Sequence, residues 1–266
     1  MNKILCFSVL FLIILLFVNK KDNMTDVSLK QRINDVIDSV YIIAVPNRKS
    51  YMKRVLNYYD IKGEFIDTIM KDTLDKKNLV NQKLLHYDHE NQEKIFKRKE
   101  IGFSGLNTGR IACHLSHMKA LKIFLKSDHE NCLIFEDDIK MNNKKKVISK
   151  FVETIRSLPK GWEYANLGRC WDKCSKDKYV NNYLVRSIRP LCRHAYVVSR
   201  SGARKILNYC LPMKGYPGDH HYAEMVHKKL LNAFSSKEQI FFQNRETLGT
   251  NLGNNNIIKT CSPFTI

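Results

Sequence analysis

The sequence predicts an α/β domain, and three observations support this prediction. Short apolar runs rich in β-branched residues alternate along the chain with segments whose apolar residues recur at helical spacing. The first of these runs, residues 39–45, is almost wholly apolar, which is typical of a strand buried on both faces of a parallel sheet. A length of 266 residues, with 44% hydrophobic and 27% charged residues, gives a single domain of this class an ample core.

An apolar segment, residues 4–18, precedes these elements and is flanked by Lys3, Lys20 and Lys21. A helix of this length spans about 22 Å, which is less than the hydrocarbon core of a bilayer, about 30 Å. The segment is typical of a secretory signal or a short signal anchor, and a buried core helix is the weaker alternative because the run is apolar all round. No small-x-small cleavage site follows, so we favour an uncleaved type II membrane anchor over residues 1–22, with a secreted protein as the outcome of cleavage.

The chain then continues into its first folded unit. We expect residues 23–38 to form a polar stem or a short helix. Residues 39–45, 51–59 and 64–70 have the patterns of a strand, a helix and a second strand, which together make a βαβ unit. Residues 72–105 are polar and rich in lysine without a strong period, and we interpret them as a mobile insert with a helical piece.

The clearest helical pattern covers residues 109–126, whose apolar side chains fall on one face. His114 and His117 are three residues apart and are therefore neighbours on the surface of this helix. We favour a packing role or a role beside a substrate over a zinc pair, because a His-x-x-His pair alone is a weak metal signal.

Three consecutive acids follow the next apolar run, and they are the strongest sign of chemistry in the chain. Leu133-Ile-Phe135 predicts a buried strand, and Glu136, Asp137 and Asp138 come directly after it. Clustered carboxylates at the carboxyl edge of a sheet repel one another unless a cation lies among them, and ligands of α/β folds bind at that edge. Strand alternation would put Glu136 and Asp138 on one face and Asp137 on the other, a good arrangement for a hard divalent ion. The alternative is a solvated acidic turn.

The remaining patterns continue the alternation of strands and helices. Turn residues at 215–221 deliver polar groups, and residues 247–266 are rich in asparagine and glycine and are expected to be irregular. Ser199 or Ser201 is a candidate cap for the helix that follows them. The predicted helices are residues 146–158, 202–209 and 222–231, and the predicted strands are residues 162–167, 180–188, 193–199 and 239–242.

Eight cysteines are present, and three of them lie close to a histidine in the second half of the chain. Cys170, Cys174 and Cys192 with His194 raise the question of a zinc site, but their spacing is not that of a standard zinc ribbon. With a secretory leader, a disulfide within this group is the favoured interpretation, and its pairing stays open. Cys113 and Cys132 lie in apolar surroundings and are predicted to be core residues.

The formal net charge is +19, so anionic partners are expected: nucleotides, phosphorylated sugars, acidic polymers or a membrane surface. Nucleic acid is disfavoured, because the chain has no zinc-finger pattern, no aromatic RNA-binding motif and no single basic stripe.

Taken together, the motifs resemble glycosyltransferase family 25, which includes bacterial lipooligosaccharide galactosyltransferases and collagen hydroxylysine galactosyltransferases. The resemblance covers residues 40–243. The family usually has Asn-Leu-Asp-Arg after the first strand, whereas this chain has Val45-Pro-Asn-Arg48. Four blocks carry the resemblance: Val40-Tyr-Ile-Ile-Ala-Val-Pro-Asn-Arg48, Gly109-Arg-Ile-Ala-Cys-His-Leu-Ser-His-Met-Lys-Ala-Leu121, Leu133-Ile-Phe-Glu-Asp-Asp-Ile139 and His194-Ala-Tyr-Val-Val-Ser-Arg-Ser-Gly-Ala-Arg-Lys-Ile-Leu207.

The resemblance implies a GT-A-like (Rossmann-like) single nucleotide-sugar-binding domain with a mixed sheet, here residues 39–246. It implies a metal-dependent, inverting transfer of a hexose, galactose by default, from a UDP-sugar to a hydroxyl of a glycan or of a collagen-like protein acceptor. Such an enzyme would be anchored in the membrane and would face the lumen of the secretory pathway.

The resemblance also implies roles for individual residues. Mn²⁺ would be held by Glu136 and Asp138 as the two acidic positions of a D-x-D pattern, and a histidine of the later turn, His221 in our assignment or His220, would complete the metal site. Asn47, Arg48 and Asp137 would contact the donor. Asp219 would be the base that deprotonates the acceptor hydroxyl, and its alternative role is a helix cap.

Three other classes compete with this prediction. The first is a non-catalytic binding protein on a glycosyltransferase scaffold, and the intact acid cluster argues against it. A metal-dependent phosphodiester hydrolase would need more histidine and aspartate ligands at several strand ends. A nucleic-acid binder would show salt-sensitive binding to any polyanion, without dependence on a sugar nucleotide.

Overall fold

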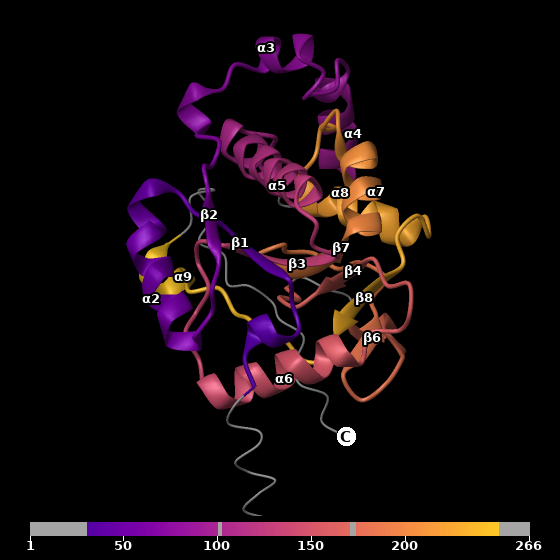
Figure 1. Ribbon diagram of the computed structural model, residues 1–266. Helices are drawn as coiled ribbons and strands as arrows, with labels where there is room; N and C mark the ends of the chain where they lie inside the picture. Colours follow the sequence, from indigo (N-terminus) through magenta and orange to yellow (C-terminus); the bar gives the residue numbers. More distant parts are fainter. Residues whose placement is uncertain (1–30, 101–102, 171–173, 250–266) are drawn as a thin grey trace, which may run out of the picture.

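The structure is a computed structural model that describes residues 31–100, 103–170 and 174–249 (Figure 1). The predicted membrane segment, the start of the stem and nearly all of the tail lie outside these described residues. Within the described ranges, no helix has both the length and the apolar character needed to cross a bilayer.

An eight-stranded mixed sheet forms the centre of the molecule, in the order β2-β1-β3-β7-β4-β8-β6-β5. The pairs β1–β2, β1–β3 and β4–β8 are parallel, whereas β7 runs antiparallel to both β3 and β4. The predicted α/β class with a mixed sheet is therefore confirmed. The strands are β1 (Ser39–Ile43), β2 (Glu64–Ile66), β3 (Asn131–Glu136), β4 (Tyr164–Asn166), β5 (Lys178–Tyr179), β6 (Leu184–Arg186), β7 (Ala195–Ser199) and β8 (Ala233–Ser236).

Helices cover both faces of this sheet, as the doubly buried sequence of β1 requires. Val40 and Ile42 belong to the core cluster shared with α2 (Lys49–Tyr59) and α6 (Lys144–Arg156). Tyr41 and Ile43 point to the other face, where they join α5 (Thr108–Lys126), α7 (Arg200–Cys210) and α8 (Gly218–His227). Figure 1 shows α6 on one side of the sheet and α5, α7 and α8 on the other.

Local sequence explains where the main helices begin. The side chain of Asn107 accepts a hydrogen bond from the Arg110 amide at the start of α5, and Ser199 does the same for Gly202 at the start of α7. Of the two serines proposed as caps, Ser199 is therefore the N-cap. The helix predicted at residues 222–231 begins earlier, at Gly218, directly after Pro217.

The insert is more ordered than the sequence suggested. It contains α3 (Lys76–Asn81), α4 (His89–Lys99) and a 3₁₀ turn, Lys71–Thr73. Leu79 and Leu85 form a third apolar cluster with residues of α5. The predicted helical piece of the insert is confirmed, and a few spaced leucines anchor this otherwise polar stretch to α5.

In the last quarter of the chain one predicted strand is wrong and one strand was not predicted. Residues 239–242 form no strand, because Ile240 and Phe241 are buried and both of their amides donate to one carbonyl, that of Leu167. The strand that was not predicted is β8, at Ala233–Ser236. Its sequence, Ala-Phe-Ser-Ser, contains no β-branched residue and therefore gives no strand signal.

The topology brings several segment ends to one edge of the sheet. Ile43, the last residue of β1, pairs with Glu136, the last residue of β3. Because β7 is antiparallel to β3, its beginning lies at the same edge, and the Glu136 amide donates to the His194 carbonyl at 2.9 Å. The acids after β3 therefore face the segment that leads into β7.

Candidate active site

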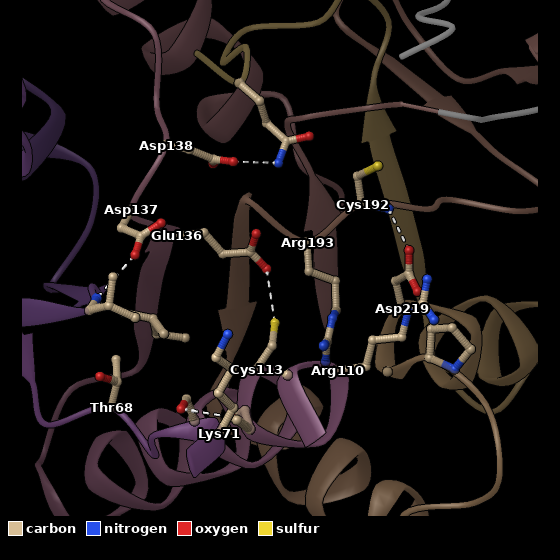
Figure 2. A pocket seen from close by; sticks show the side chains of 18 of the residues that line it. Thr68, Lys71, Arg110, Cys113, Glu136, Asp137, Asp138, Cys192, Arg193 and Asp219 are labelled. Atoms are coloured by element: carbon tan, nitrogen blue, oxygen red, sulfur yellow. Dashed lines mark hydrogen bonds between the residues drawn. The ribbon is translucent and has the colours of Figure 1, made fainter. Parts of the chain in front are cut away.

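A cavity of about 720 Å³ opens at this edge of the sheet (Figure 2). The ends of β1 and β3, the segment before β7, the first turn of α8 and the insert all line it. The residues that line it include Asn47, Arg48, Phe96, Arg110, Cys113, Glu136, Asp137, Asp138, Arg193, Asp219, His220, Gln243 and Arg245.

The three consecutive acids point in three directions, because β3 ends at Glu136 and a turn follows. The prediction that Glu136 and Asp138 share a strand face is therefore wrong. Glu136 points towards α5, where its Oε1 lies 2.9 Å from His117 Nε2 and 3.6 Å from Cys113 Sγ. Burial raises the pKa of Glu136, but the hydrogen bond from His117 and the charges of His117, Arg193 and His194 together outweigh this effect, so the pKa lies below its usual value.

Asp137 fastens the end of β1 to the end of β3. Its carboxylate accepts hydrogen bonds from the Val45 amide at 3.0 Å and from Arg48 Nη1 at 2.9 Å. The other terminal nitrogen of Arg48 donates to the carbonyls of Leu248 and Gly249. Arg48 and Asp137 thus form a buried clamp, and the guanidinium is already engaged by protein groups.

Asp138 has the environment that most strongly suggests a ligand. Its Oδ2 accepts a hydrogen bond from Gln243 Nε2 at 2.8 Å, while its buried Oδ1 has no partner among the described residues. Burial, together with the charges of Glu136 and Asp137, raises the pKa of Asp138 to about 7. A buried carboxylate oxygen without a donor is costly, and a bound cation would satisfy it.

The residues fit a divalent cation of the Mg²⁺ or Mn²⁺ type, although not a complete protein cage. Such ions are commonly held by one or two carboxylates, with water and substrate phosphates in the remaining positions. In the described residues Asp138 belongs to no group of three closely spaced ligands; the groups are Cys113–His117–Glu136 and Cys170–Cys192–His194. The orphaned Oδ1 of Asp138 is therefore the atom that would hold the ion.

Asp219 lines the same cavity from the first turn of α8. Its Oδ2 accepts from the Cys192 amide and its Oδ1 from the His220 amide, both at 3.1 Å. Burial raises the pKa of Asp219, but the charges of His220 and Arg193 outweigh that effect and keep the pKa below its usual value. The carboxylate is thus ionised and fixed in orientation at neutral pH.

Comparison with known proteins agrees with this geometry. The sequence model of glycosyltransferase family 25, described as LPS biosynthesis proteins, matches residues 38–222, which is more than half of the chain. This chain belongs to glycosyltransferase family 25. It is similar to the "Probable inactive glycosyltransferase 25 family member 3" of Bos taurus, with 25% identity over 178 residues. Those residues are 64% of this chain and 28% of the bovine protein, so the chain matches less than a third of that relative.

Within this family 25 domain, most of the predicted site residues meet at the cavity. Asn47, Arg48, Asp137, Glu136, Asp138 and Asp219 all line it. His221 does not line it: the side chain is fully buried, with its ring centroid 4.5 Å from that of Tyr216 and 5.1 Å from that of His114. Helix periodicity explains the difference, since the preceding residue, His220, faces the cavity.

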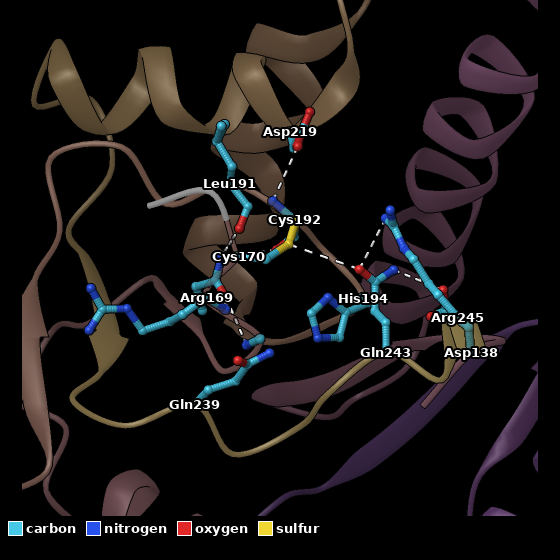
Figure 3. The surroundings of a disulfide bond; sticks show 12 residues. Asp138, Arg169, Cys170, Leu191, Cys192, His194, Asp219, Gln239, Gln243 and Arg245 are labelled. Atoms are coloured by element: carbon cyan, nitrogen blue, oxygen red, sulfur yellow. Dashed lines mark hydrogen bonds between the residues drawn. A yellow bond between two sulfur atoms is a disulfide. The ribbon is translucent and has the colours of Figure 1, made fainter. Parts of the chain in front are cut away.

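The cysteine group of this family 25 domain contains a disulfide between Cys170 and Cys192, as Figure 3 shows. It joins the segment after β4 to the segment before β7. His194 is not a metal ligand in this arrangement, because its Nε2 lies 3.0 Å from the Phe241 carbonyl and its ring packs on Gly168. Cys174 is also disulfide-bonded. The disulfide interpretation is confirmed, and the zinc alternative is not supported.

Several site residues were not found from the sequence. Cys113 was predicted to be a plain core residue, but it is partly exposed on the cavity wall. His117 was correctly placed on a packed or substrate-side face, yet its bond to Glu136 depends on the packing of α5 against β3. Gln243 and Arg193 carried no sequence signal at all, because only the fold brings them to the acids.

Proposed function

We propose that the protein transfers a hexosyl group, galactose by default, from a UDP-sugar to a hydroxyl of a glycan or protein acceptor, with inversion of configuration. The observation that carries this proposal is the orphaned Oδ1 of Asp138 in an acid cluster that shares one cavity with the fixed carboxylate of Asp219. Membership in family 25 supports group transfer of this kind.

Each side chain has a defined task in this mechanism. Asp138 would hold a divalent cation, Mn²⁺ in our proposal, and that ion would offset the charge of the departing diphosphate. The ionised Asp219 accepts the proton of the acceptor hydroxyl as the oxygen bonds to the anomeric carbon and the bond from that carbon to the diphosphate breaks. The amides of Cys192 and His220 hold the carboxylate in place for this step.

Donor binding is assigned to the end of β1. Asn47 is exposed to the cavity. Asp137 is 9% exposed and Arg48 7%, so these two position the loop around the donor through their mutual ion pair. We also propose that residues 1–22 anchor the enzyme in a membrane of the secretory pathway with the domain on the lumenal side.

The test is UDP release by the full-length protein in detergent, measured with a panel of UDP-sugars in Mn²⁺ and in EDTA. We expect cation-dependent release with one donor and its loss, by at least about a hundredfold, in Asp138→Asn. Asp72→Asn, an exposed acid in the insert, is the matched control and should keep full activity. NMR of the glycoside product would then establish inversion.

The competing function is a binding protein that has kept the scaffold but not the reaction. The name of the bovine relative includes the word "inactive", which makes this candidate specific. UDP binding measured by calorimetry, with no release from any donor and no transfer to sugar or peptide acceptors, would favour it over the enzyme.

A further inference from the structure

Arg193 is a buried cation that contacts no counter-ion among the residues that the structure describes. Its side chain is 4% exposed and lines the cavity, between those of Glu136 and Asp219 in Figure 2. Its polar contacts are Nη1 to His114 Nδ1 at 3.4 Å and a hydrogen bond to the Tyr222 hydroxyl, and its guanidinium carbon lies 4.9 Å from the centre of the Tyr222 ring. None of the ion pairs among the described residues includes Arg193.

The other two buried arginines among the described residues are both compensated by protein groups. Arg48 forms an ion pair with Asp137. Arg169 is fully buried, and its guanidinium pairs with Asp177 and donates to the carbonyls of Ser236 and Lys237. That is the usual way in which a protein compensates a buried charge. Arg193 has no comparable set of acceptors, so the folded protein bears the cost of a desolvated guanidinium at the cavity wall.

The neighbouring charges do not remove this cost. The carboxylates of Asp219 and Glu136 lower the energy of Arg193 from a distance, but each is hydrogen-bonded to other groups. The guanidinium also packs on the first turn of α8, so closely that a side chain at Gly218 would overlap with it. The amino end of a helix carries partial positive charge, which adds to the charge of Arg193 and makes the place attractive to an anion.

Two other arginines at this wall are committed to protein partners. Arg110 donates to the Ser104 hydroxyl and to the Gly105 carbonyl, and Arg189 forms an ion pair with Glu100 at 2.7 Å. Among the described arginines of this wall, Arg193 and Arg245 keep donors that are free for a ligand. Arg245 donates to Gln243 Oε1, whereas Arg193 is the one that packs on the first turn of α8, next to Asp219. A planar guanidinium with several free N–H groups matches the oxygens of a phosphate group.

We propose that Arg193 is the receptor for the diphosphate group of the donor, an identification of the anion that rests on the proposed function. Arg193 thus contributes a fixed positive charge to the cavity that does not depend on the cation at Asp138. Part of the affinity for a diphosphate should consequently survive removal of divalent metal.

Calorimetry on the full-length protein in detergent tests this proposal with three probes: uridine, UDP and inorganic pyrophosphate, each in EDTA and in Mn²⁺. In EDTA we expect UDP to bind more tightly than uridine. Arg193→Met should weaken the binding of UDP and of pyrophosphate about tenfold to a hundredfold and leave the affinity for uridine unchanged. Arg54→Met, at an exposed arginine of α2 that does not line the cavity, is the matched control and should change none of the three affinities by more than about twofold.

Thermal unfolding separates a receptor from a packing residue. Removing an uncompensated buried charge should leave the melting temperature of the ligand-free Arg193→Met protein unchanged or raise it, while pyrophosphate should stabilise the wild type alone. A lower melting temperature with an unchanged ratio of UDP to uridine affinity would overturn the proposal and make Arg193 structural.

The two proposals fail in different ways. If UDP binds and is released from a donor, but equally well in Arg193→Met, the transferase stands and the receptor assignment is wrong. If pyrophosphate binds through Arg193 but neither uridine nor UDP-sugars bind, the anion receptor stands and the sugar-nucleotide function is wrong.

Discussion

Asp138 shares a short turn with two other carboxyl groups, and its protonation depends on both of them. Its pKa is raised from an ordinary value of 3.8 to about 7 by burial and by the charges of Glu136 and Asp137. The folded protein therefore holds a proton on Asp138 in a range of pH in which the unfolded chain has lost it. By linkage, the free energy of unfolding must fall as pH rises across that range.

We predict that the metal-free protein loses stability between about pH 4 and pH 7 through this group, by no more than about 4 kcal/mol. Urea unfolding in EDTA at several pH values in this window measures the slope. Asp138→Asn should flatten it, and excess Mn²⁺ should restore stability at pH 7 by binding the carboxylate. A slope that persists unchanged in Asp138→Asn would assign the titration to another group.

At the scale of elements, the sequence predicted those segments in which pattern and packing agree. Helix α5 is buried along much of its length, and its predicted bounds, 109–126, differ from the observed start by one residue. The run Leu133-Ile-Phe135 is buried on both sides and forms a strand, as its composition predicts. The three acids were placed at the correct edge of the sheet, because that edge is set by chain direction alone.

The wrong predictions concern features that are set by contacts between residues far apart in the sequence. The alternation expected for Glu136 and Asp138 fails because β3 pairs only as far as Glu136, and no local signal marks that end. Gln243 reaches Asp138 across a separation of more than a hundred residues. The residues around Gln243 in the sequence do not indicate this contact, because the contact depends on how the segment after β8 packs.

The insert supplies a prediction at this same scale. Helix α4 docks on residues 214–217, where the Gly215 amide donates to Gln92 Oε1 at 3.0 Å and Phe96 stacks on Tyr216 at 5.2 Å. A Cβ at Gly215 would overlap with the backbone carbonyl of His89, which cannot move without the helix. Gly215→Ala should therefore displace α4 and cost about 1–3 kcal/mol in stability.

Limited proteolysis followed by mass spectrometry measures this displacement as faster cleavage within residues 71–106, and thermal unfolding measures the loss of stability. Lys94→Ala changes an exposed residue of α4 and serves as the control, with cleavage at the wild-type rate. If Gly215→Ala is cut no faster than Lys94→Ala, the close docking of α4 on this loop is not the feature that orders the insert.

At the scale of the whole molecule, the site depends on one covalent link between distant parts of the sheet edge. The Cys170–Cys192 disulfide ties the segment after β4 to the segment before β7. Cys192 has a left-handed backbone, with φ of 61°, and its amide donates to Asp219. The next residue is Arg193. The proposed base and the proposed diphosphate receptor are thus both positioned through a residue that this disulfide holds.

The disulfide forms only in an oxidising compartment, and the secretory pathway predicted from the N-terminal segment is such a compartment. A link across a sequence separation of 22 residues should contribute about 3 kcal/mol to stability. We predict that the double variant Cys170→Ser, Cys192→Ser loses about 2–4 kcal/mol in stability and binds UDP several-fold more weakly, because Arg193 and Asp219 lose their fixed backbone. Urea unfolding and calorimetry measure the two effects.

A free cysteine away from the cavity, Cys132 in β3, provides the control. Cys132→Ala should leave UDP affinity unchanged, because this buried thiol packs in the core with α5 and α7 and is not one of the cavity-lining residues. Protein made in a reducing cytosol should behave like the double variant and regain UDP affinity on oxidation. Equal UDP affinity in the oxidised wild type and the double variant would show that the sheet edge orders the site without the disulfide, and would remove the physical reason that ties this domain to an oxidising compartment.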